Sequence, residues 1–330
     1  MSLSFASSTD ALPVAGVTPL PSALRAPTMR DAVMAVPTGW RAKSGAALEG
    51  EAIRLRIVGN PSGPAVLVLG GISAGRLVTA EDDGWWSRLA GPGRAIDTDH
   101  VTVIGADYPP EALREAADLC PEDFARLLHA ALTRAGISSL KAIIGASFGG
   151  MIALAFARLY PETTGAVSVL CAAHRPSPMG TALRLVQRQI LELTSGTNRE
   201  ADGVALARQL AMTTYRTQEE FDERFGRGGE DLEAYLGHHG RQYAGRISAA
   251  RYLTLSNAID QHEEDPRQIK VPVQVIAADS DRLVPLSLVQ EFASWLPNLD
   301  GYHVLRSVYG HDAFLKECRA IAPLLRRFLS

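Results

Sequence analysis

The sequence predicts an α/β fold: a mostly parallel, doubly wound sheet, covered on both faces and interrupted by a helical insertion. Three observations predict it. Short apolar runs alternate with helical patterns from residue 65 onward, which is typical of parallel sheets. After His174 only helical patterns follow, and a further apolar run begins at Val271. We therefore expect three parts, which are a poorly ordered N-terminal arm over residues 1–37, a core over residues 38–175 and 265–330, and a helical lid over residues 176–264.

Length and composition are those of an ordinary soluble protein. The chain has 330 residues, is 46% hydrophobic and 21% charged, and carries a formal net charge of −3. This charge, with no long run of Lys or Arg, argues against nucleic acid and against an anionic membrane surface as partners. No window of about twenty residues is apolar enough to span a bilayer, and no secretion signal precedes the first strand. We expect neither secretion nor membrane insertion.

The three cysteines are Cys120, Cys171 and Cys318, which lie far apart in the sequence. None of them has the C-x-x-C spacing of a zinc site, and their number gives no disulfide framework. They fit a reducing cytoplasm. We therefore predict a cytoplasmic protein with no metal site and no permanently bound cofactor.

The first elements can be read in order. Residues 1–37 are rich in Ser, Ala, Pro and Thr and have little periodicity, which is why we expect a poorly ordered arm. Residues 51–58 alternate polar and apolar side chains, as in a half-exposed edge strand. Residues 65–69 read as a fully buried strand. The loop Gly70–Gly75 follows it, but because it has neither a complete P-loop nor a complete G-x-G-x-x-G pattern, we expect it to supply oxyanion-hole donors rather than to bind phosphate.

The remaining elements follow the same periodicities. Trp85 and Trp86 stand in a loop and are expected to pack against the core. Buried strands are expected over residues 101–107, 142–144, 165–171, 271–277 and 302–305; helices are expected over residues 121–135, 152–159, 285–296 and 313–328, with further helices in the lid.

The segment Gly145-Ala146-Ser147-Phe148-Gly149 has the G-x-S-x-G pattern of a nucleophile elbow. It follows a buried strand and precedes a helical pattern. Such a turn holds its middle residue in a strained conformation, and small residues two positions before and after it let the backbones pass. Ser147 would then stand at a helix N-terminus, where N–H groups and the helix dipole favour a developing negative charge.

A serine nucleophile needs a base, and the base needs an acid that orients it. On a doubly wound sheet these groups lie on loops after the carboxyl ends of strands. Asp279 and Asp281 follow the strand at residues 271–277, and His311 follows the strand at residues 302–305. We predict His311 as the base and prefer Asp281, which lies deeper in its loop, as the acid. One of the two aspartates is expected to cap the next helix instead.

The oxyanion hole is expected to use two backbone N–H groups. One belongs to Phe148, the residue after the nucleophile. The other comes from the loop after residues 65–69, where Ser73 is our choice and Ile72 the alternative. Because the donors are backbone groups, the side chains at these positions are of secondary importance.

From about residue 40 to the C-terminus, the chain resembles the homoserine O-acyltransferases of the α/β-hydrolase superfamily. The similarity is carried by several separate motifs, so it is far more specific than an elbow alone, and it favours Asp281 as the acid. The matching segments are Gly145 to Met151, Thr214-Tyr215-Arg216-Thr217 with Phe221 and Arg224 to Gly226, Glu233 to Leu236, Tyr252 to Asp260, Asp281-Arg282-Leu283-Val284-Pro285, and Tyr309-Gly310-His311-Asp312-Ala313-Phe314-Leu315.

The resemblance implies an α/β-hydrolase fold with a helical lid and a ping-pong reaction. An acyl group would pass from acyl-CoA, the co-substrate, to Ser147 and then to the hydroxyl of homoserine in methionine synthesis. It also implies that Arg208 and Asp312 hold the amino acid, with Tyr215 as a further contact, because Arg can clamp the carboxylate and Asp can take the ammonium. A homodimer formed through the lid is what the resemblance suggests.

Several points stay open at the level of sequence. The loop Gly70–Ala74 departs from the H-A-L-T-G of the family, so the donor can be acetyl-CoA or succinyl-CoA; Arg76 can pair with a succinyl carboxylate or lie at the surface. The acceptor can be homoserine or serine. Two other functions compete, namely an esterase or thioesterase with the same triad, and a non-catalytic binding protein of the same fold.

Overall fold

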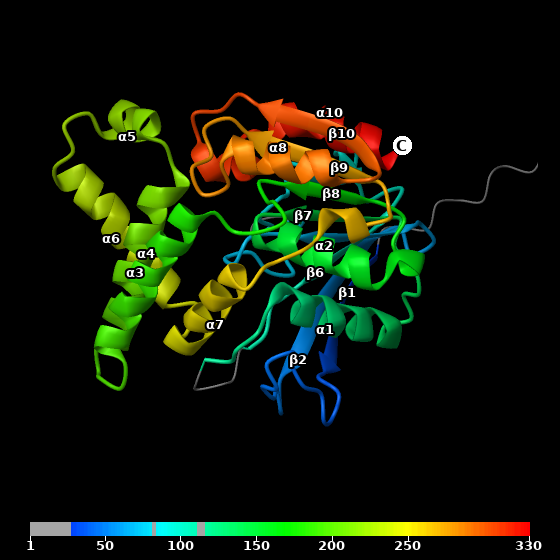
Figure 1. The fold of residues 1–330 in the computed structure, drawn as a ribbon, viewed down its shortest axis with the longest axis horizontal. Coiled ribbons are helices and arrows are strands. Elements are labelled where there is room, and N and C mark those ends of the chain that lie inside the picture. Colours follow the sequence, from blue (N-terminus) through cyan, green and yellow to red (C-terminus); the bar gives the residue numbers. More distant parts are fainter. Residues whose placement is uncertain (1–27, 81–83, 111–115) are drawn as a thin grey trace, which may run out of the picture.

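The computed structural model describes residues 28–80, 84–110 and 116–330. Its main element is an eight-stranded sheet with the strand order β1-β2-β6-β3-β7-β8-β9-β10 (Figure 1). The pairs β1–β2 and β2–β6 are antiparallel and all the others are parallel. The strands are β1 (Thr28–Ala35), β2 (Ala52–Gly59), β3 (Ala65–Leu69), β6 (Thr102–Ala106), β7 (Ala142–Ala146), β8 (Val167–Leu170), β9 (Val273–Ala278) and β10 (Leu299–Leu305). The predicted α/β class and mostly parallel sheet are confirmed.

The N-terminal part of the sheet corrects two expectations. Residues 28–35 form β1, although they were expected to belong to a poorly ordered arm; residues 1–27 lie outside the described part of the chain. β1 pairs with β2 along its whole length, so β2 lies between β1 and β6 and is not an edge strand. β1 buries only Ala32, which is why its sequence lacks the apolar alternation that marks a strand.

The sheet separates two hydrophobic cores, because successive side chains of a strand point to opposite faces. On one face, Ile143 and its neighbours pack against α1 (Pro121–Arg134), α2 (Phe148–Leu159) and α8 (Leu286–Trp295). On the other face, Ile144 packs with α10 (Cys318–Leu329) and with residues 84–101, which include the short strands β4 (Ala90–Gly91) and β5 (Ile96–Asp97). Trp86 is buried in this second core, as expected for a packing residue.

The C-terminal helix, expected to run without interruption from residue 313 to residue 328, is divided. A turn η3 (Gly310–Asp312) leads into α9 (Ala313–Lys316), and α10 begins after Glu317. The indole Nε1 of Trp86 donates a hydrogen bond of 2.8 Å to the carbonyl oxygen of Phe314. A continuous helix would use that oxygen to accept from Cys318, so the Trp86 contact favours the break.

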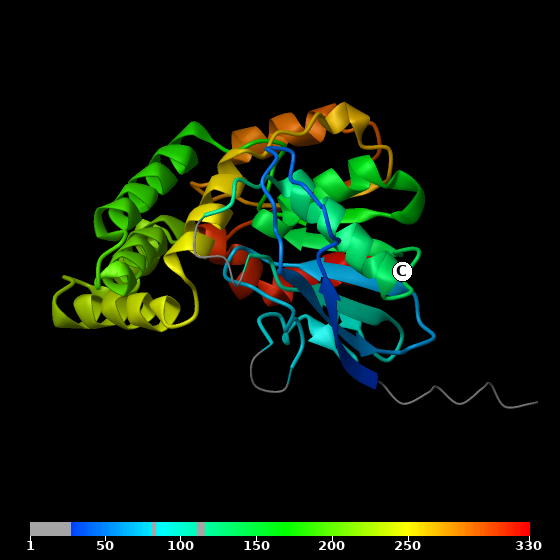
Figure 2. The ribbon, with the colours of Figure 1, turned by 90° about the horizontal axis from the view of Figure 1, so that it is seen from below.

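Five helices fill residues 178–260 and stand to one side of the sheet (Figures 1 and 2). They share a small core of their own, in which Leu191, Val204, Ala207 and Tyr252 are buried. Tyr252 donates a hydrogen bond of 2.8 Å to Gln187 across this core. The helices are α3 (Pro178–Thr194), α4 (Glu200–Tyr215), α5 (Gln218–Phe225), α6 (Glu230–Ala244) and α7 (Ala249–Asp260).

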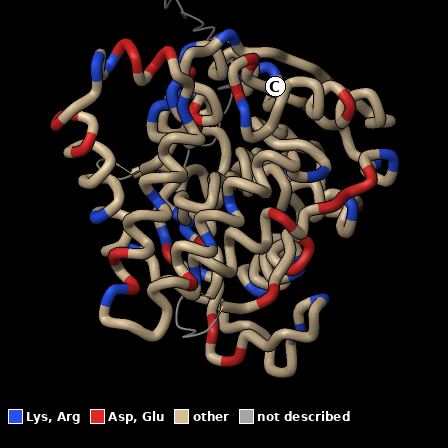
Figure 3. Tube along the Cα trace, turned by 60° about the vertical axis from the view of Figure 1, so that its left-hand side comes forward, with Lys and Arg blue, Asp and Glu red and all other residues tan. Residues whose placement is uncertain are grey.

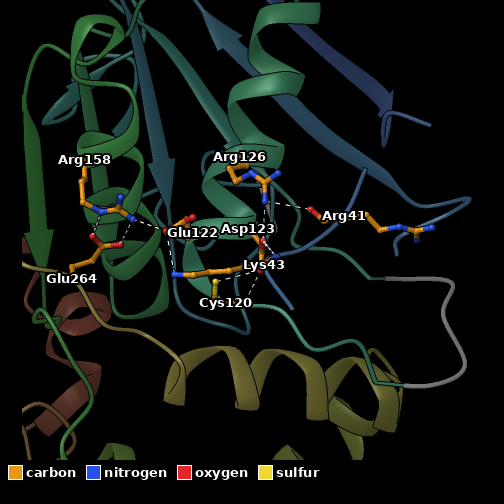
Figure 4. A network of polar contacts seen from close by, with 8 residues as sticks. All are labelled: Arg41, Lys43, Cys120, Glu122, Asp123, Arg126, Arg158 and Glu264. Atoms are coloured by element: carbon orange, nitrogen blue, oxygen red, sulfur yellow. Dashed lines mark hydrogen bonds and ion pairs between the residues drawn. The ribbon is translucent and has the colours of Figure 1, made fainter. Parts of the chain in front are cut away.

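Where the chain returns from α7 to the sheet, a network of charges fixes it to the core (Figure 4). Arg158 on α2 donates to Glu264 at 2.5 Å and to Glu122 on α1 at 2.6 Å. Lys43 lies 3.7 Å from the same Glu122. The Arg158 guanidinium therefore holds the buried carboxylate of Glu264 in place and also links α2 to α1.

Charges of both signs are interspersed along the chain trace (Figure 3). In the part of the chain that the structure describes, no helix is long and apolar enough to cross a membrane. In the same residues, no group of His, Cys, Asp or Glu is arranged to hold a metal ion. Cys120, Cys171 and Cys318 are free and buried.

Candidate active site

The elbow is formed where β7 ends and α2 begins. Ser147 has φ 53° and ψ −120°, a left-handed conformation that is strained for a residue with a side chain. A Cβ on Gly145 would overlap the carbonyl oxygen of Gly149, and a Cβ on Gly149 would overlap that of Leu69. The two glycines are therefore required by the close approach of backbones, which is the reason the G-x-S-x-G pattern predicts this turn.

Three side chains form a continuous hydrogen-bonded chain at the carboxyl end of the sheet. Ser147 Oγ lies 2.7 Å from His311 Nε2, and His311 Nδ1 lies 2.7 Å from Asp281 Oδ2. His311 and Asp281 are buried, at 7% and 4% exposure, while Ser147 is partly accessible. The residues that the sequence selected from three distant segments are thus in direct contact, in the geometry that activates a serine hydroxyl.

The turn before His311 depends on a glycine. Gly310 has φ +57°, and a Cβ there would lie 2.8 Å from the carbonyl oxygen of Tyr215 at the end of α4. Thr217 Oγ1 also donates to the carbonyl oxygen of Val308 at 2.5 Å. The loop that carries His311 is therefore packed directly against the chain that leaves α4.

The charge of the imidazole is set by its surroundings. Burial by itself lowers the pKa of His311, but the Asp281 carboxylate, through its charge and its hydrogen bond, outweighs burial and raises that pKa above its ordinary value. Asp312 contributes in the same direction. An imidazolium formed during proton transfer from Ser147 would therefore be stabilised at this position.

The two aspartates of the loop after β9 have different partners. Asp281 binds His311 through Oδ2, and its Oδ1 accepts hydrogen bonds of 2.9 and 3.0 Å from the backbone N–H groups of Leu283 and Val284. Asp279 instead accepts from the backbone N–H of Ser307 at 3.1 Å. The expectation that one of the two aspartates caps the next helix is wrong, because the N-cap of α8 is Pro285 and no side chain caps it. Asp281 instead orients the histidine and holds its own turn.

The first turn of α2 and the loop after β3 both lie beside the serine. Phe148 is the first residue of α2, so its N–H belongs to the first turn, which lacks partners within the helix. The next three N–H groups have acceptors, because Gly149 donates to Gly70, and Gly150 and Met151 donate to Ser147. A Cβ on Gly71 would lie 3.8 Å from Ser147 Oγ, so the segment Gly71–Ser73 passes beside the nucleophile.

Ser147 and His311 line a cleft between the sheet and the helices α3, α4 and α7. Every residue expected to contact the amino acid lines it, namely Arg208, Tyr215 and Asp312, and so does Ser73. Arg208 lies over the rings of Tyr215 and Tyr243, at 5.3 and 4.5 Å from their centroids, and donates to Ser73 Oγ at 3.1 Å. These contacts fix the Arg208 guanidinium in the wall of the cleft that Ser147 also lines.

Asp312 is buried at 9% exposure and lies 3.3 Å from Nε of Arg216, which also pairs with Glu220. Burial raises the pKa of Asp312, while the charge of Arg216 opposes that rise. Arg216 is a residue that sequence reasoning missed in this role. It lies in one of the matching segments, but its pairing with Asp312 arises only when α4 packs on the His311 turn.

Other cleft residues were not selected from the sequence. Arg184 on α3 lines the cleft and is held by Asp260 at 2.5 Å, and Trp85 lines it from the far core. Neither has a local sequence signal, since Arg184 lies in an ordinary amphipathic helix. Arg76 lies beside the cleft but does not line it. It binds Asp107 Oδ2 at 2.5 Å and faces an adjoining cavity.

A parallel sheet with a serine at an elbow, an acid after a later strand and a histidine after the last strand defines an α/β hydrolase. In agreement, residues 65–317 match the family described as alpha/beta hydrolase fold. The esterase E22 structure superposes with a TM-score of 0.81 at 21% identity, covering 92% of this chain and 100% of that one. At that identity the similarity establishes the fold alone.

Sequence relatives define the family more narrowly. The chain is 37% identical over 285 residues to the homoserine O-succinyltransferase of Xanthomonas campestris pv. campestris, covering 83% of this chain and 77% of the relative. It is 32% identical over 294 residues to the homoserine O-acetyltransferase of Chlorobium chlorochromatii, covering 76% of this chain and 82% of the relative. The chain belongs to the homoserine O-acyltransferase family of the α/β-hydrolase superfamily, as the sequence motifs predicted.

Proposed function

We propose that this protein transfers an acetyl or succinyl group from acyl-CoA to the hydroxyl of L-homoserine, with Ser147 as the acyl carrier. The observation that carries the proposal is the hydrogen-bonded chain Ser147–His311–Asp281 in a cleft that also holds Arg208 and Asp312. The relatives, named as homoserine acyltransferases with two different donors, support the reaction but leave the donor open.

In the first half-reaction Ser147 Oγ attacks the thioester carbon while His311 Nε2 takes the hydroxyl proton. Asp281 keeps Nδ1 protonated and stabilises the imidazolium. The N–H of Phe148 and one from the turn at Ile72 and Ser73 stabilise the oxyanion of the tetrahedral intermediate. When the C–S bond breaks, His311 returns its proton to the sulfur and CoA leaves as the thiol.

In the second half-reaction the acceptor hydroxyl occupies the place that CoA has left. His311 removes its proton, the oxygen attacks the acyl-Ser147 ester, and the Ser147 oxygen leaves with the proton from His311. Arg208 binds the α-carboxylate of the amino acid, Asp312 binds its α-ammonium, and Tyr215 bounds the site. Arg216 positions Asp312 for that contact.

Residues 176–264 act as the lid in this proposal, because they supply Arg208 and Tyr215 to a nucleophile carried by the sheet. We also propose a homodimer formed through the lid. Leu193 on α3 is 83% exposed and Leu206 on α4 is 53% exposed. A partner subunit would cover these large apolar side chains. Light scattering on the purified protein tests this, and a monomer at all concentrations would contradict it.

Hydrolysis is the second candidate, because an esterase shares the fold. A water acceptor needs no site for a zwitterion, whereas Arg208 and Asp312 provide one. The test is a CoA-release assay that crosses acetyl-CoA and succinyl-CoA with homoserine and serine. We expect release that depends on homoserine and yields the O-acyl ester in equal amount. Release at the same rate without any amino acid would indicate a hydrolase, and preference for serine would reassign the acceptor.

A further inference from the structure

A second cavity adjoins the catalytic cleft. The two share Ile72, Ser73, Ala74 and Arg208, so the loop that passes beside Ser147 forms a wall of both. The outer wall of the second cavity comes from the end of α6, the turn that follows it, and the start of α7. The catalytic cleft and the second cavity therefore lie next to each other, on either side of this loop.

The second cavity is strongly cationic. Arg76, Arg208, Arg246 and Arg251 line it, while Asp107 is its one carboxylate among the described residues. These groups sum to a net charge of +3, as four positive charges less one negative. Asp107 is itself bound by Arg76, through contacts of 2.8 Å to the backbone N–H and 2.5 Å to the guanidinium. A field of this sign in a concave space attracts anions.

The positions of the arginines differ within the cavity. Arg76 is held by Asp107, the residue that follows β6. Arg251 lies on α7, and its burial lowers the pKa of its guanidinium. Arg246 follows α6 and is exposed to solvent, beside exposed Gln242. The cavity therefore has an inner end near the oxyanion loop and an open end at Arg246.

The amino-acid substrate engages only Arg208 of these four arginines and leaves Arg76, Arg246 and Arg251 to another ligand. Homoserine carries one carboxylate, for which Arg208 provides a site in the cleft, and its ammonium would be repelled by the second cavity. The acyl donor is the other substrate, and it carries the remaining anions. They are the phosphates of CoA and, in a dicarboxylic donor such as succinyl-CoA, a terminal carboxylate.

Building on the proposed function, we propose that the arginine-lined cavity is the subsite for an anionic group of the acyl donor, either a nucleotide phosphate or the terminal carboxylate of the acyl chain. The inner arginines lie nearest the acyl chain and Arg246 lies at the open end. Both sources share the chemistry of an oxyanion that accepts hydrogen bonds from guanidinium groups.

The test uses four donors with the full-length enzyme. Acetyl-CoA and succinyl-CoA carry the phosphates, whereas S-acetyl- and S-succinyl-N-acetylcysteamine lack them. The variant is Arg246→Gln. The matched control is Arg241→Gln, which changes an exposed arginine near the end of α6, five residues before Arg246, that does not line the cavity. We expect Arg246→Gln to raise the donor KM about tenfold, as for loss of one charged hydrogen bond, with kcat and the homoserine KM unchanged.

The pattern across donors identifies the anion. A rise confined to the two CoA thioesters assigns a phosphate, and a rise confined to the two succinyl donors assigns the carboxylate. Gln242→Lys adds a cation at the open end and should lower the same KM values. Unchanged donor KM in Arg246→Gln for every donor, or a rise in the homoserine KM instead, would overturn the inference. Failure of the wild type to acylate homoserine from any donor would instead overturn the proposed function.

Discussion

At the scale of single residues, His311 is placed between two carboxylates that favour its charged form. Its neutral form is the one that can accept the proton of Ser147. Because the pKa of His311 is raised in the folded enzyme, kcat/KM should fall as the pH drops through a value above 6.5, the ordinary value for histidine. A pH–rate profile measures this limb directly.

Asp281→Asn should change that profile in two ways. Loss of the negative charge moves the acid limb to lower pH, and loss of the Nδ1 acceptor lowers kcat on the order of 10³-fold or more. Asp279→Asn is the matched control, because Asp279 contacts only the backbone N–H of Ser307 among the hydrogen bonds of this loop. An equal effect of both substitutions would exclude Asp281 as the orienting acid.

Arg208 gives a prediction about the acceptor. Arg208→Ala should raise the KM for homoserine about tenfold or more, since a hydrogen bond to a charged group contributes about 1.5–3 kcal/mol. Arg199→Ala, an exposed arginine at the start of α4 paired only with Asp202, should leave that KM unchanged. Steady-state kinetics at saturating donor provide the measurement. The assignment fails if the homoserine KM of Arg208→Ala equals that of the wild type.

At the scale of elements, the return of the chain from α7 depends on one guanidinium. Arg158→Ala leaves Glu264, whose side chain is 3% exposed, without its partner, and should lower the free energy of unfolding by about 3 kcal/mol. Lys43→Ala removes a largely exposed contact to Glu122 in the same network and should cost below about 1 kcal/mol. Urea unfolding of both variants tests the difference; equal losses would contradict it.

The elements also mark how far the sequence could predict the fold. Strands such as 65–69 and the elbow were predictable because buried apolar runs and a local glycine pattern determine them. β1 was not, since it is held by pairing with β2 and buries one side chain. The break before α10 was also hidden, because Trp86, far away in the chain, takes the oxygen that a continuous helix would use.

The same distinction applies to the site. Ser147, Asp281 and His311 each stand in a loop whose position after a strand can be read locally, and the structure brings them into contact. Arg216 and Arg184 enter the site only because helices α3 and α4 pack beside the carboxyl end of the sheet. Which N–H from the turn at Ile72 and Ser73 acts as the second oxyanion donor stays a prediction.

At the scale of the whole molecule, helices α3 to α7 and the sheet are joined through two segments that are hydrogen-bonded to each other. His262 Nε2 donates a hydrogen bond of 2.9 Å to the carbonyl oxygen of Ala173. The backbone N–H of Glu264 donates a hydrogen bond of 2.9 Å to the carbonyl oxygen of His174. Burial, with a smaller contribution from His174, lowers the pKa of His262 to about 3. Among the described residues, Nδ1 of His262 has no hydrogen-bond partner. The junction is therefore built around a neutral histidine.

This junction predicts a loss of stability in acid. Below pH 6.5 the unfolded chain binds a proton at this histidine that the folded protein does not, so stability falls by about 1.4 kcal/mol per pH unit down to about pH 3. The His262→Gln variant should have a lower free energy of unfolding than the wild type at pH 8. Between pH 7 and pH 5, however, its free energy of unfolding should fall by less than that of the wild type. His238→Gln, an exposed control on α6, should keep the wild-type slope. Chemical unfolding at each pH provides the comparison.

A single-turnover measurement tests whether Ser147 carries the acyl group between the two substrates. The enzyme is mixed with acyl-CoA, the intact mass is followed, and homoserine is then added. We expect a mass increase of one acyl group located on Ser147 and absent in Ser147→Ala. Homoserine should accelerate the loss of this acyl group at least tenfold, with formation of an equal amount of O-acylhomoserine. Loss of the acyl group at the same rate with and without homoserine, or acylation of Ser147→Ala, would contradict it.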